Sequence, residues 1–163
     1  MSNSRGLRTD SLVGRPIRLE DLDDYQALDN DREVTQWAVG GPTEEQGMKR
    51  AIQHWEEHGL GLWTFLSDDG AFVGYAGLTH TLRVLPGEDR FQLRCAVCSE
   101  HRRHGYATEM TNAVVDFAFK QKGVDEVIGA AESDNIASRK LMEKCGFRYD
   151  RKCEIYRRSS RAD

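Results

Sequence analysis

Hydrophobic and polar positions along the chain repeat with two different periods, so the sequence predicts both helices and strands. Apolar residues recur every three or four positions, the spacing of one helical face, in the ranges 22–28, 48–55, 107–118 and 137–145. Polar and apolar residues alternate from Phe91 to Cys98, as they do in a strand with one buried face. Two apolar runs flank Asp68-Asp69-Gly70, and this turn predicts a β-hairpin between residues 60 and 79.

The order of these elements predicts the fold class. Small and β-branched residues at 127–131 indicate a strand buried on both faces, and the helix before it makes this strand parallel to 91–98. We therefore expect one α/β (α+β) domain, with a mixed, mostly antiparallel sheet of six to seven strands and about four helices on its faces. This domain is expected to span residues 13–156, between a flexible N-terminus at 1–12 and a flexible tail at 157–163.

The C-terminal end is short for this arrangement. Sixteen residues follow Phe147, and the segment from Arg157 to Arg161 has the composition of a disordered tail. We expect a complete seventh strand with its connecting turn to be missing. Such a gap would leave one side of the sheet open or require a neighbouring subunit to complete it.

Composition excludes several classes of protein. With 163 residues, of which 39% are hydrophobic, the chain can bury one core without disulfide or metal staples. Its formal net charge is -4, so no global basic field favours nucleic acid or an anionic membrane. The first residues lack the apolar core of a signal peptide and no apolar run is long enough to span a membrane. We expect a cytoplasmic protein whose four cysteines are reduced thiols.

A basic, glycine-containing loop joins the strand at 91–98 to the helix that follows. It contains Arg102-Arg103-His104-Gly105-Tyr106-Ala107, and the free N–H groups at the start of a helix favour an anion there. Gly105 and Ala107 let the backbone approach a bulky ligand, and the two arginines add charge and fork-shaped donors. These properties suit a pyrophosphate. Taken alone, the loop also fits a simple turn with solvated arginines.

The region from Phe91 to Phe147 resembles the GNAT superfamily of acetyl-coenzyme A-dependent N-acetyltransferases. Arg102-x-x-Gly105-x-Ala107 is similar to the superfamily's pyrophosphate loop, and the string from His104 to Glu109 resembles the branch that acetylates ribosomal-protein N-termini. Asn135-Ile136-Ala137-Ser138 is similar to the second motif of that branch, in which the asparagine bonds the pantetheine arm. Taken alone, Asn135 is typical of a helix cap.

The resemblance implies acetyl-coenzyme A as co-substrate and a sheet that splays between its fourth and fifth strands, at Val97 and Ala131. It also implies that the cofactor's arm pairs with backbone groups in this gap. A strand N–H would bond the thioester oxygen as it becomes an oxyanion, a donor often worth about 3 kcal/mol. The cofactor-binding residues expected on this basis are Cys95, Ala96, Val97, Arg102, Arg103, His104, Gly105, Tyr106, Ala107, Thr108 and Asn135.

The resemblance also suggests which side chains move protons. Met142 stands where the superfamily often has a tyrosine that protonates the departing thiolate. Ser138, at a position where the ribosomal branch has serine, is the expected substitute, although an ordinary helix-interior hydroxyl is the alternative interpretation. Glu132 is the first candidate for the base that accepts a proton from the amine. The alternatives for the base are Asp134, Glu100 and His101.

These features predict an N-acetyltransferase in which an amine attacks the thioester directly within a ternary complex. The acceptor that the resemblance implies first is a protein N-terminal α-amine. Such an amine has a pKa near 8 and is neutral at pH 7 far more often than lysine, whose pKa is about 10.4, so a weak base would suffice. A small amine is the second acceptor, and a non-catalytic acyl-coenzyme A sensor is the alternative from another class. Neither nucleic acid nor a membrane is expected as a partner, and both a monomer and a homodimer are compatible with the sequence.

Two further patterns receive other interpretations. Cys95-x-x-Cys98-x-x-His101-x-x-His104 has residue types that suit zinc, but strand residues three apart point to opposite faces, so no metal site is expected. The same geometry disfavours a disulfide between the two cysteines. Of the tryptophans Trp37, Trp55 and Trp63, the first is best placed to line an acceptor pocket, whereas Trp55 is expected in the core.

Overall fold

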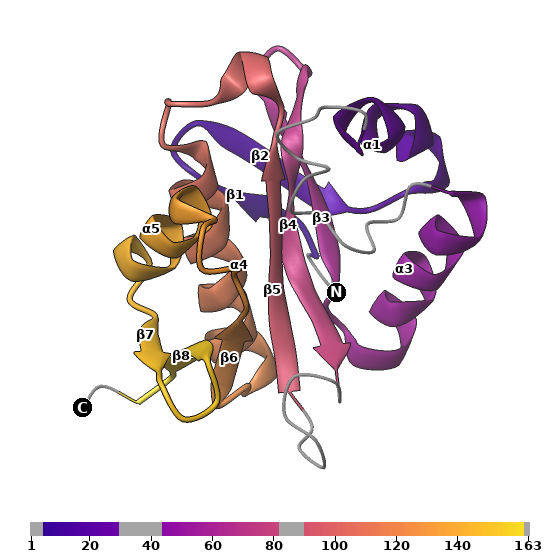
Figure 1. The fold of residues 1–163 in the computed structure, drawn as a ribbon. Coiled ribbons are helices and arrows are strands. Elements are labelled where there is room, and N and C mark those ends of the chain that lie inside the picture. The colour runs from indigo at the N-terminus through magenta and orange to yellow at the C-terminus, as the bar shows by residue number, and fades with distance from the viewer. Residues whose placement is uncertain (1–4, 30–43, 82–89, 162–163) are drawn as a thin grey trace.

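The computed structural model describes residues 5–29, 44–81 and 90–161, which form an eight-stranded sheet with helices on both faces (Figure 1). The strands are β1 Leu7–Arg8, β2 Leu12–Pro16, β3 Leu62–Ser67, β4 Phe72–Thr81, β5 Arg90–Val97, β6 Glu126–Gly129, β7 Arg148–Asp150 and β8 Ile155–Ser159. The α-helices are α1 Leu22–Asp29, α3 Glu45–His58, α4 Tyr106–Lys122 and α5 Ile136–Lys144. Short 3-10 helices occupy Leu19–Asp21 and Ser99–His101.

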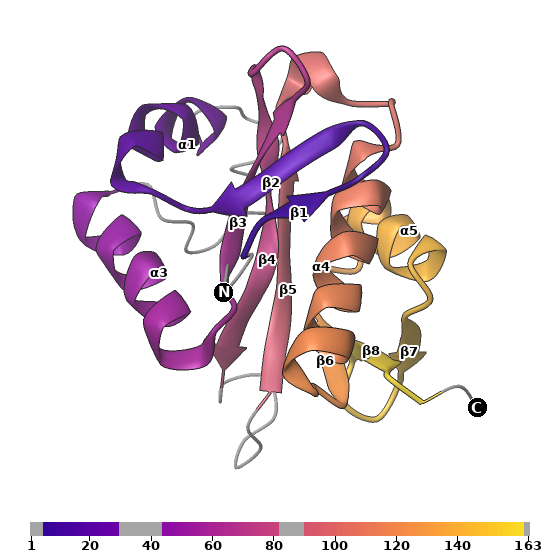
Figure 2. The same ribbon diagram turned by 180° about the vertical axis from the view of Figure 1, so that it is seen from behind.

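The sheet is mixed, as the hydrophobic pattern predicts. Its strands lie in the order β1-β2-β3-β4-β5-β6-β8-β7, and β5 and β6 are parallel while the other neighbouring pairs are antiparallel. Helices α1 and α3 lie on one side of the central strands, and α4 and α5 lie on the other (Figures 1 and 2). The predicted fold class is confirmed, with eight strands in place of six to seven. No helix in the described ranges is long and apolar enough to cross a membrane.

The predicted hairpin and the predicted gap in the sheet are both present. Gly70, in the turn between β3 and β4, has a φ of 86°, which favours glycine. Strand β5 pairs with β6 at only two positions, Phe91 with Val127 and Gln92 with Ile128. Because β6 ends at Gly129, two residues before the predicted end of this strand, the rest of β5 continues without it. The sheet therefore splays between β5 and β6.

Both segments that we expected to be flexible contain strands. At the N-terminal end, Leu7 and Arg8 form β1 and pair with β2. At the C-terminal end, residues 157–159 belong to β8, which pairs with the whole of β6 on one edge and with β7 on the other. The last strand is thus present within the chain. Ile155 and Tyr156 are buried in β8, and this apolar pair gives the short segment a reason to join the sheet.

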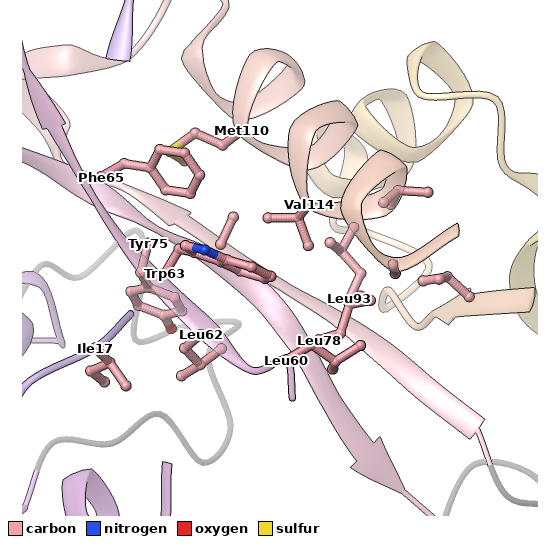
Figure 3. Packing of buried hydrophobic residues seen from close by; sticks show 14 of the residues in the cluster. Ile17, Leu60, Leu62, Trp63, Phe65, Tyr75, Leu78, Leu93, Met110 and Val114 are labelled. Carbon is pink, nitrogen blue, oxygen red and sulfur yellow. The ribbon is translucent and has the colours of Figure 1, made fainter. Parts of the chain in front are cut away.

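Large apolar side chains fill the space between the sheet and α4 (Figure 3). Phe65 and Met110 pack near one end of this layer, and Leu93 and Val114 lie further along it. Trp55 and Trp63 are both buried and meet edge to face, with ring centroids 4.6 Å apart. The expectation for Trp55 is confirmed, and Trp63 is also a core residue. Trp37 lies outside the described residues.

Candidate active site

The basic loop leaves the end of β5 and turns sharply into α4. The Cys98 N–H donates to the Val73 carbonyl at 2.9 Å, which fixes the end of β5 against β4. Further along the loop, Arg103 and Gly105 both have a positive φ, of 64° and 78°. Gly105 is the N-cap of α4, and a Cβ built on it would meet no protein atom within 4 Å. Backbone conformation, and not crowding within the chain, is therefore what favours glycine here.

The first turn of α4 has unused donors. Gly105 supplies no side-chain cap, and the first helical hydrogen bond runs from the Glu109 N–H to the Gly105 carbonyl at 3.1 Å. The N–H groups of Tyr106, Ala107 and Thr108 find no acceptor in the part of the chain that the structure describes. These donors and the positive end of the helix dipole together make the turn suitable for an anion.

Some side chains of the loop contact the rest of the protein, and others are exposed to solvent. The Arg102 Nε donates to the Val97 carbonyl at 3.2 Å and so ties the loop to the end of β5. The ring of His104 stacks on Tyr106 with centroids 5.4 Å apart, and its Nδ1 lies 3.1 Å from the His101 carbonyl oxygen. Arg103 is exposed.

The second half of β5 has one open backbone edge next to this loop. Cys95, Ala96 and Val97 pair with β4, but β6 gives them no ladder partner. Burial raises the pKa of the Cys95 thiol to about 12, and the Thr111 hydroxyl of α4 lies beside it. The Cys98 thiol has another environment, 3.8 Å from the Phe72 carbonyl oxygen. The two thiols therefore do not converge on one place, and all four cysteines are free.

The turn between β6 and α5 carries the other predicted site residues. Asn135 is the N-cap of α5, and its Oδ1 accepts from the Ser138 N–H at 3.1 Å. The capping interpretation of Asn135 is thus confirmed, and its side-chain NH₂ is the group that can still donate. Ser138 is partly buried in the first turn of the helix, whereas Glu132 is exposed. The structure brings these three residues into one short segment, and their roles toward cofactor and amine stay predictions.

Met142 is buried and belongs to the packing of α5. Its side chain lies against Gly129 at the end of β6, where an added Cβ would come within 2.5 Å of the sulfur. This apolar side chain fills the position at which the superfamily often has a tyrosine.

A buried polar network, which the sequence did not indicate, holds α1 on its face of the sheet. Arg15 forms two hydrogen bonds with the Asp21 carboxylate, at 2.9 and 2.7 Å, and Thr64 donates to the same group at 2.7 Å. The Tyr25 hydroxyl lies 3.0 Å from that of Thr64. Burial would raise the pKa of Asp21, but these hydrogen bonds and the Arg18 N–H outweigh it and lower the pKa. The participants lie up to 49 residues apart in sequence, so no local pattern marks them.

A cavity of about 410 Å³ lies away from the loop, at the other end of the C-terminal half of the sheet. Its lining comes from β6, β7, β8 and their flanks, and these strands are distant from the start of α4 in both views (Figures 1 and 2). Several arginines line it, but Arg157 is engaged by Glu126 at 2.8 Å and Asp150 at 2.8 Å. This cavity is separate from the candidate site.

The sequence matches the acetyltransferase (GNAT) domain family over residues 12–148, and the chain belongs to this family. It is 27% identical over 149 residues to YoaA of Bacillus subtilis (strain 168), an uncharacterised N-acetyltransferase. That match covers 86% of this chain and 81% of the relative. The chain is accordingly an acetyl-coenzyme A-dependent N-acetyltransferase.

Solved acetyltransferase structures share the fold. An acetyltransferase from Agrobacterium tumefaciens str. C58 superposes with a TM-score of 0.78 at 23% identity, covering 97% of this chain and 96% of that one. Ribosomal-protein-S5-alanine acetyltransferase from Vibrio fischeri gives a TM-score of 0.72 at 15% identity, with coverages of 95% and 96%. Spermidine N-acetyltransferase from Vibrio cholerae, in complex with CoA and spermine, gives 0.68 at 15% identity, with coverages of 90% and 92%.

Proposed function

We propose that this acetyltransferase acts on a protein N-terminal α-amine, and that the start of α4 holds the pyrophosphate of its cofactor. The observation that carries the proposal is the uncapped first turn of α4, with three unused N–H groups, directly beside the open edge of β5. The turn suits the phosphates and the edge suits an amide-rich arm. One ligand with both chemical features, acetyl-coenzyme A, would span the two.

The cofactor-binding residues have distinct parts in this proposal. The N–H groups of residues 105–108 would receive the phosphates, with Arg103 and His104 beside them. The backbone of Cys95, Ala96 and Val97 would pair with the pantetheine amides. The Oδ1 of Asn135 accepts from the Ser138 N–H, and its side-chain NH₂ would donate to a carbonyl of the arm.

The transfer step follows from the same arrangement. The neutral amine attacks the thioester carbon while a β5 N–H stabilises the developing oxyanion. The carbon–sulfur bond then breaks, the Ser138 hydroxyl passes a proton to the departing thiolate, and the hydroxyl takes a proton back from solvent water in the same step. Glu132, which is exposed near the start of α5, accepts the proton that the amine loses. Replacing Glu132 by Gln should therefore lower kcat while the Kd for acetyl-coenzyme A stays unchanged.

A protein N-terminus is favoured over a small amine for two reasons. The string from His104 to Glu109 resembles the ribosomal-protein branch, and the enzyme that acetylates ribosomal protein S5 superposes over 95% of this chain. An α-amine also needs only a weak base at neutral pH, which suits a solvent-exposed carboxylate such as Glu132. Spermidine N-acetyltransferase shares the fold, so a polyamine is the second candidate.

The acceptor can be tested by measuring free thiol released from acetyl-coenzyme A. The panel consists of short peptides with a free N-terminal alanine or serine, the same peptides with a blocked N-terminus and an internal lysine, and spermidine. The proposal predicts turnover at least about tenfold faster with free than with blocked N-termini, since far more α-amine than lysine is neutral. Faster turnover with spermidine than with every peptide would contradict it.

A non-catalytic acyl-coenzyme A sensor is the second candidate function. The buried Met142, in place of a tyrosine, favours it because the chain then offers fewer acids near the thiolate. Calorimetry with acetyl-coenzyme A separates the two functions. Micromolar binding together with no thiol release on any acceptor would support the sensor.

A further inference from the structure

Glu109 joins the first turn of α4 to the N-terminal end of the chain. One of its carboxylate oxygens, Oε1, accepts from the Ser11 N–H at 2.7 Å and from the Thr9 hydroxyl. Both donors belong to the turn between β1 and β2, which lies beside the first turn of α4 in Figure 2. The turn is itself closed by hydrogen bonds between Thr9 and Leu12, including N–H to carbonyl at 2.9 Å. The β1–β2 turn is therefore bonded to the first turn of α4 through the Glu109 carboxylate.

The first turn of α4 has few other supports. No side chain caps it, and three of its N–H groups have no acceptor within the described ranges. An uncapped helix end frays, because its first hydrogen bonds oppose the conformational entropy of several residues. A frayed turn would not present its N–H groups together, and only the ordered fraction of molecules could bind an anion there.

The charge of Glu109 would also act on a bound anion. A carboxylate in the first turn stabilises the helix dipole but repels a phosphate at the same end. In this chain Oε1 accepts hydrogen bonds from two donors on the β1–β2 turn, and these donors reduce the repulsion between the carboxylate and a bound phosphate. The hydrogen bonds and the charge can be separated experimentally, because glutamine keeps an acceptor oxygen and loses the charge.

We infer that Glu109 is a positioning residue for the cofactor, which holds the first turn of α4 in its anion-binding form by anchoring it to Thr9 and Ser11. This inference rests on the proposed phosphate site at residues 105–108. It gives the N-terminal strands β1 and β2 a part in cofactor binding that their distance along the sequence does not suggest. Glu109 itself acts through the helix and does not need to touch the cofactor.

The test compares Glu109→Ala with Glu109→Gln in the full chain. Removal of both hydrogen bonds in Glu109→Ala should raise the Kd for acetyl-coenzyme A about tenfold, since only a fraction of molecules then has an ordered turn. The KM for acetyl-coenzyme A should rise equally, with kcat at saturating cofactor retained, because bound phosphates order the turn again. Glu109→Gln should restore binding to within about twofold of the unaltered chain, because it keeps the acceptor.

Three controls separate the inference from general damage. Asp116→Ala removes an acid further along α4, whose 3.8 Å contact is with Arg158, and should leave the Kd unchanged. Amide hydrogen exchange should become faster at residues 106–110 in Glu109→Ala and not at the end of the helix. If Glu109→Ala is too unstable to measure, Thr9→Val, which removes one of the two donors, should raise the Kd about threefold.

The outcomes distinguish this inference from the proposed site. If Gly105→Leu weakens cofactor binding while Glu109→Ala and Thr9→Val do not, the positioning role is refuted and the phosphate site stands. If Gly105→Leu has no effect either, the phosphate site itself is refuted, and the inference falls with it. Equal losses in Glu109→Ala and Glu109→Gln would also overturn the inference, because charge and not the anchoring hydrogen bonds would then be responsible.

Discussion

The first residues of β5 are paired on both edges, whereas its last residues are paired on one edge only. Phe91 and Gln92 have ladder partners in β4 and β6, but within the described ranges Leu93–Val97 have ladder partners in β4 alone, and the Val97 carbonyl also accepts from the Arg102 Nε. Unpaired backbone groups are costly when buried, so an edge left open beside an uncapped helix end indicates a place for a polar, chain-like ligand. One part of the strand thus belongs to the continuous sheet, and we propose that the other part binds the cofactor.

The largest effect should come from blocking the open end. Gly105→Leu places a side chain where the phosphates would lie and should raise the Kd for acetyl-coenzyme A about a hundredfold. Gly70→Leu is the matched control, because both glycines have a positive φ and no protein atom within 4 Å of an added Cβ. Both variants should lose similar stability, and only the first should lose affinity. Calorimetry and thermal unfolding report the two quantities, and equal affinity in both variants would argue against the site.

Removing the proposed proton donor should affect catalysis and not binding. Ser138→Ala deletes the hydroxyl but keeps the backbone N–H that Asn135 caps. We expect kcat to fall about thirtyfold with an unchanged Kd for acetyl-coenzyme A. Steady-state kinetics beside calorimetry would measure this. An unchanged kcat would mean that the hydroxyl takes no part in proton transfer.

Replacing Arg103 should lower the affinity for acetyl-coenzyme A without lowering the stability of the fold. Arg103→Gly removes a guanidinium and also relieves the positive φ of 64°, so the Kd should rise about tenfold while stability is maintained or improved. Glu154→Gly is the control, since Glu154 also has a positive φ, 55°, in the connection between β7 and β8. It should gain stability without a change in affinity. Arg103→Gly with unchanged affinity would exclude this side chain from the site.

The smallest effect is expected at the paired end of β5, on the pH dependence of the free energy of unfolding. His54, whose ring lies 6.3 Å from that of Phe91, has Nδ1 2.8 Å from the Leu60 carbonyl oxygen and accepts the His80 N–H at Nε2 at 2.9 Å. This arrangement requires a neutral ring. Burial lowers its pKa below 6.5, with smaller contributions from His58 and His80, while the hydrogen bond to Leu60 and the charge of Glu57 act in the opposite direction.

In the unfolded chain His54 therefore binds a proton as the pH falls through 6.5, whereas in the folded chain it stays neutral to a lower pH. This part of the stability is complete above pH 6.5 and declines as the pH falls below it. Urea unfolding at pH 7.5 and 5.5 should show the decline, and His54→Gln should reduce it. The Kd for acetyl-coenzyme A should be the same in both chains at pH 7.5. A His54→Gln chain with the full decline would show that other groups cause it.

The sequence predicts those structural elements that depend on residues close to one another along the chain. The hairpin around Gly70, the helix from Tyr106 and the loop between β5 and α4 each have a local pattern of turn residues and apolar spacing, and each is present. The capping role of Asn135 follows from the same kind of local rule.

Contacts between distant segments could not be predicted in this way. Strand β8 lies between β6 and β7, so its pairing depends on strands on both sides of α5. The composition of residues 157–161 alone indicates a flexible tail, because it does not show these distant partners. Glu109 lies 98 residues after its donor Ser11, and the residue alone indicates only a favourable charge at a helix start. The roles of Ser138 and Glu132 rest on resemblance, because neither side chain has a hydrogen bond to the described part of the chain that would mark it.

The most direct test of the central claim is a crystal structure of this chain with acetyl-coenzyme A. The account predicts pyrophosphate oxygens about 3 Å from the backbone nitrogens of residues 105–108, with the pantetheine arm along Cys95–Val97 in the opening between β5 and β6. Phosphates bound elsewhere, for example in the arginine-lined cavity beside β7 and β8, would contradict it. So would a second half of β5 that stays covered while the cofactor is bound.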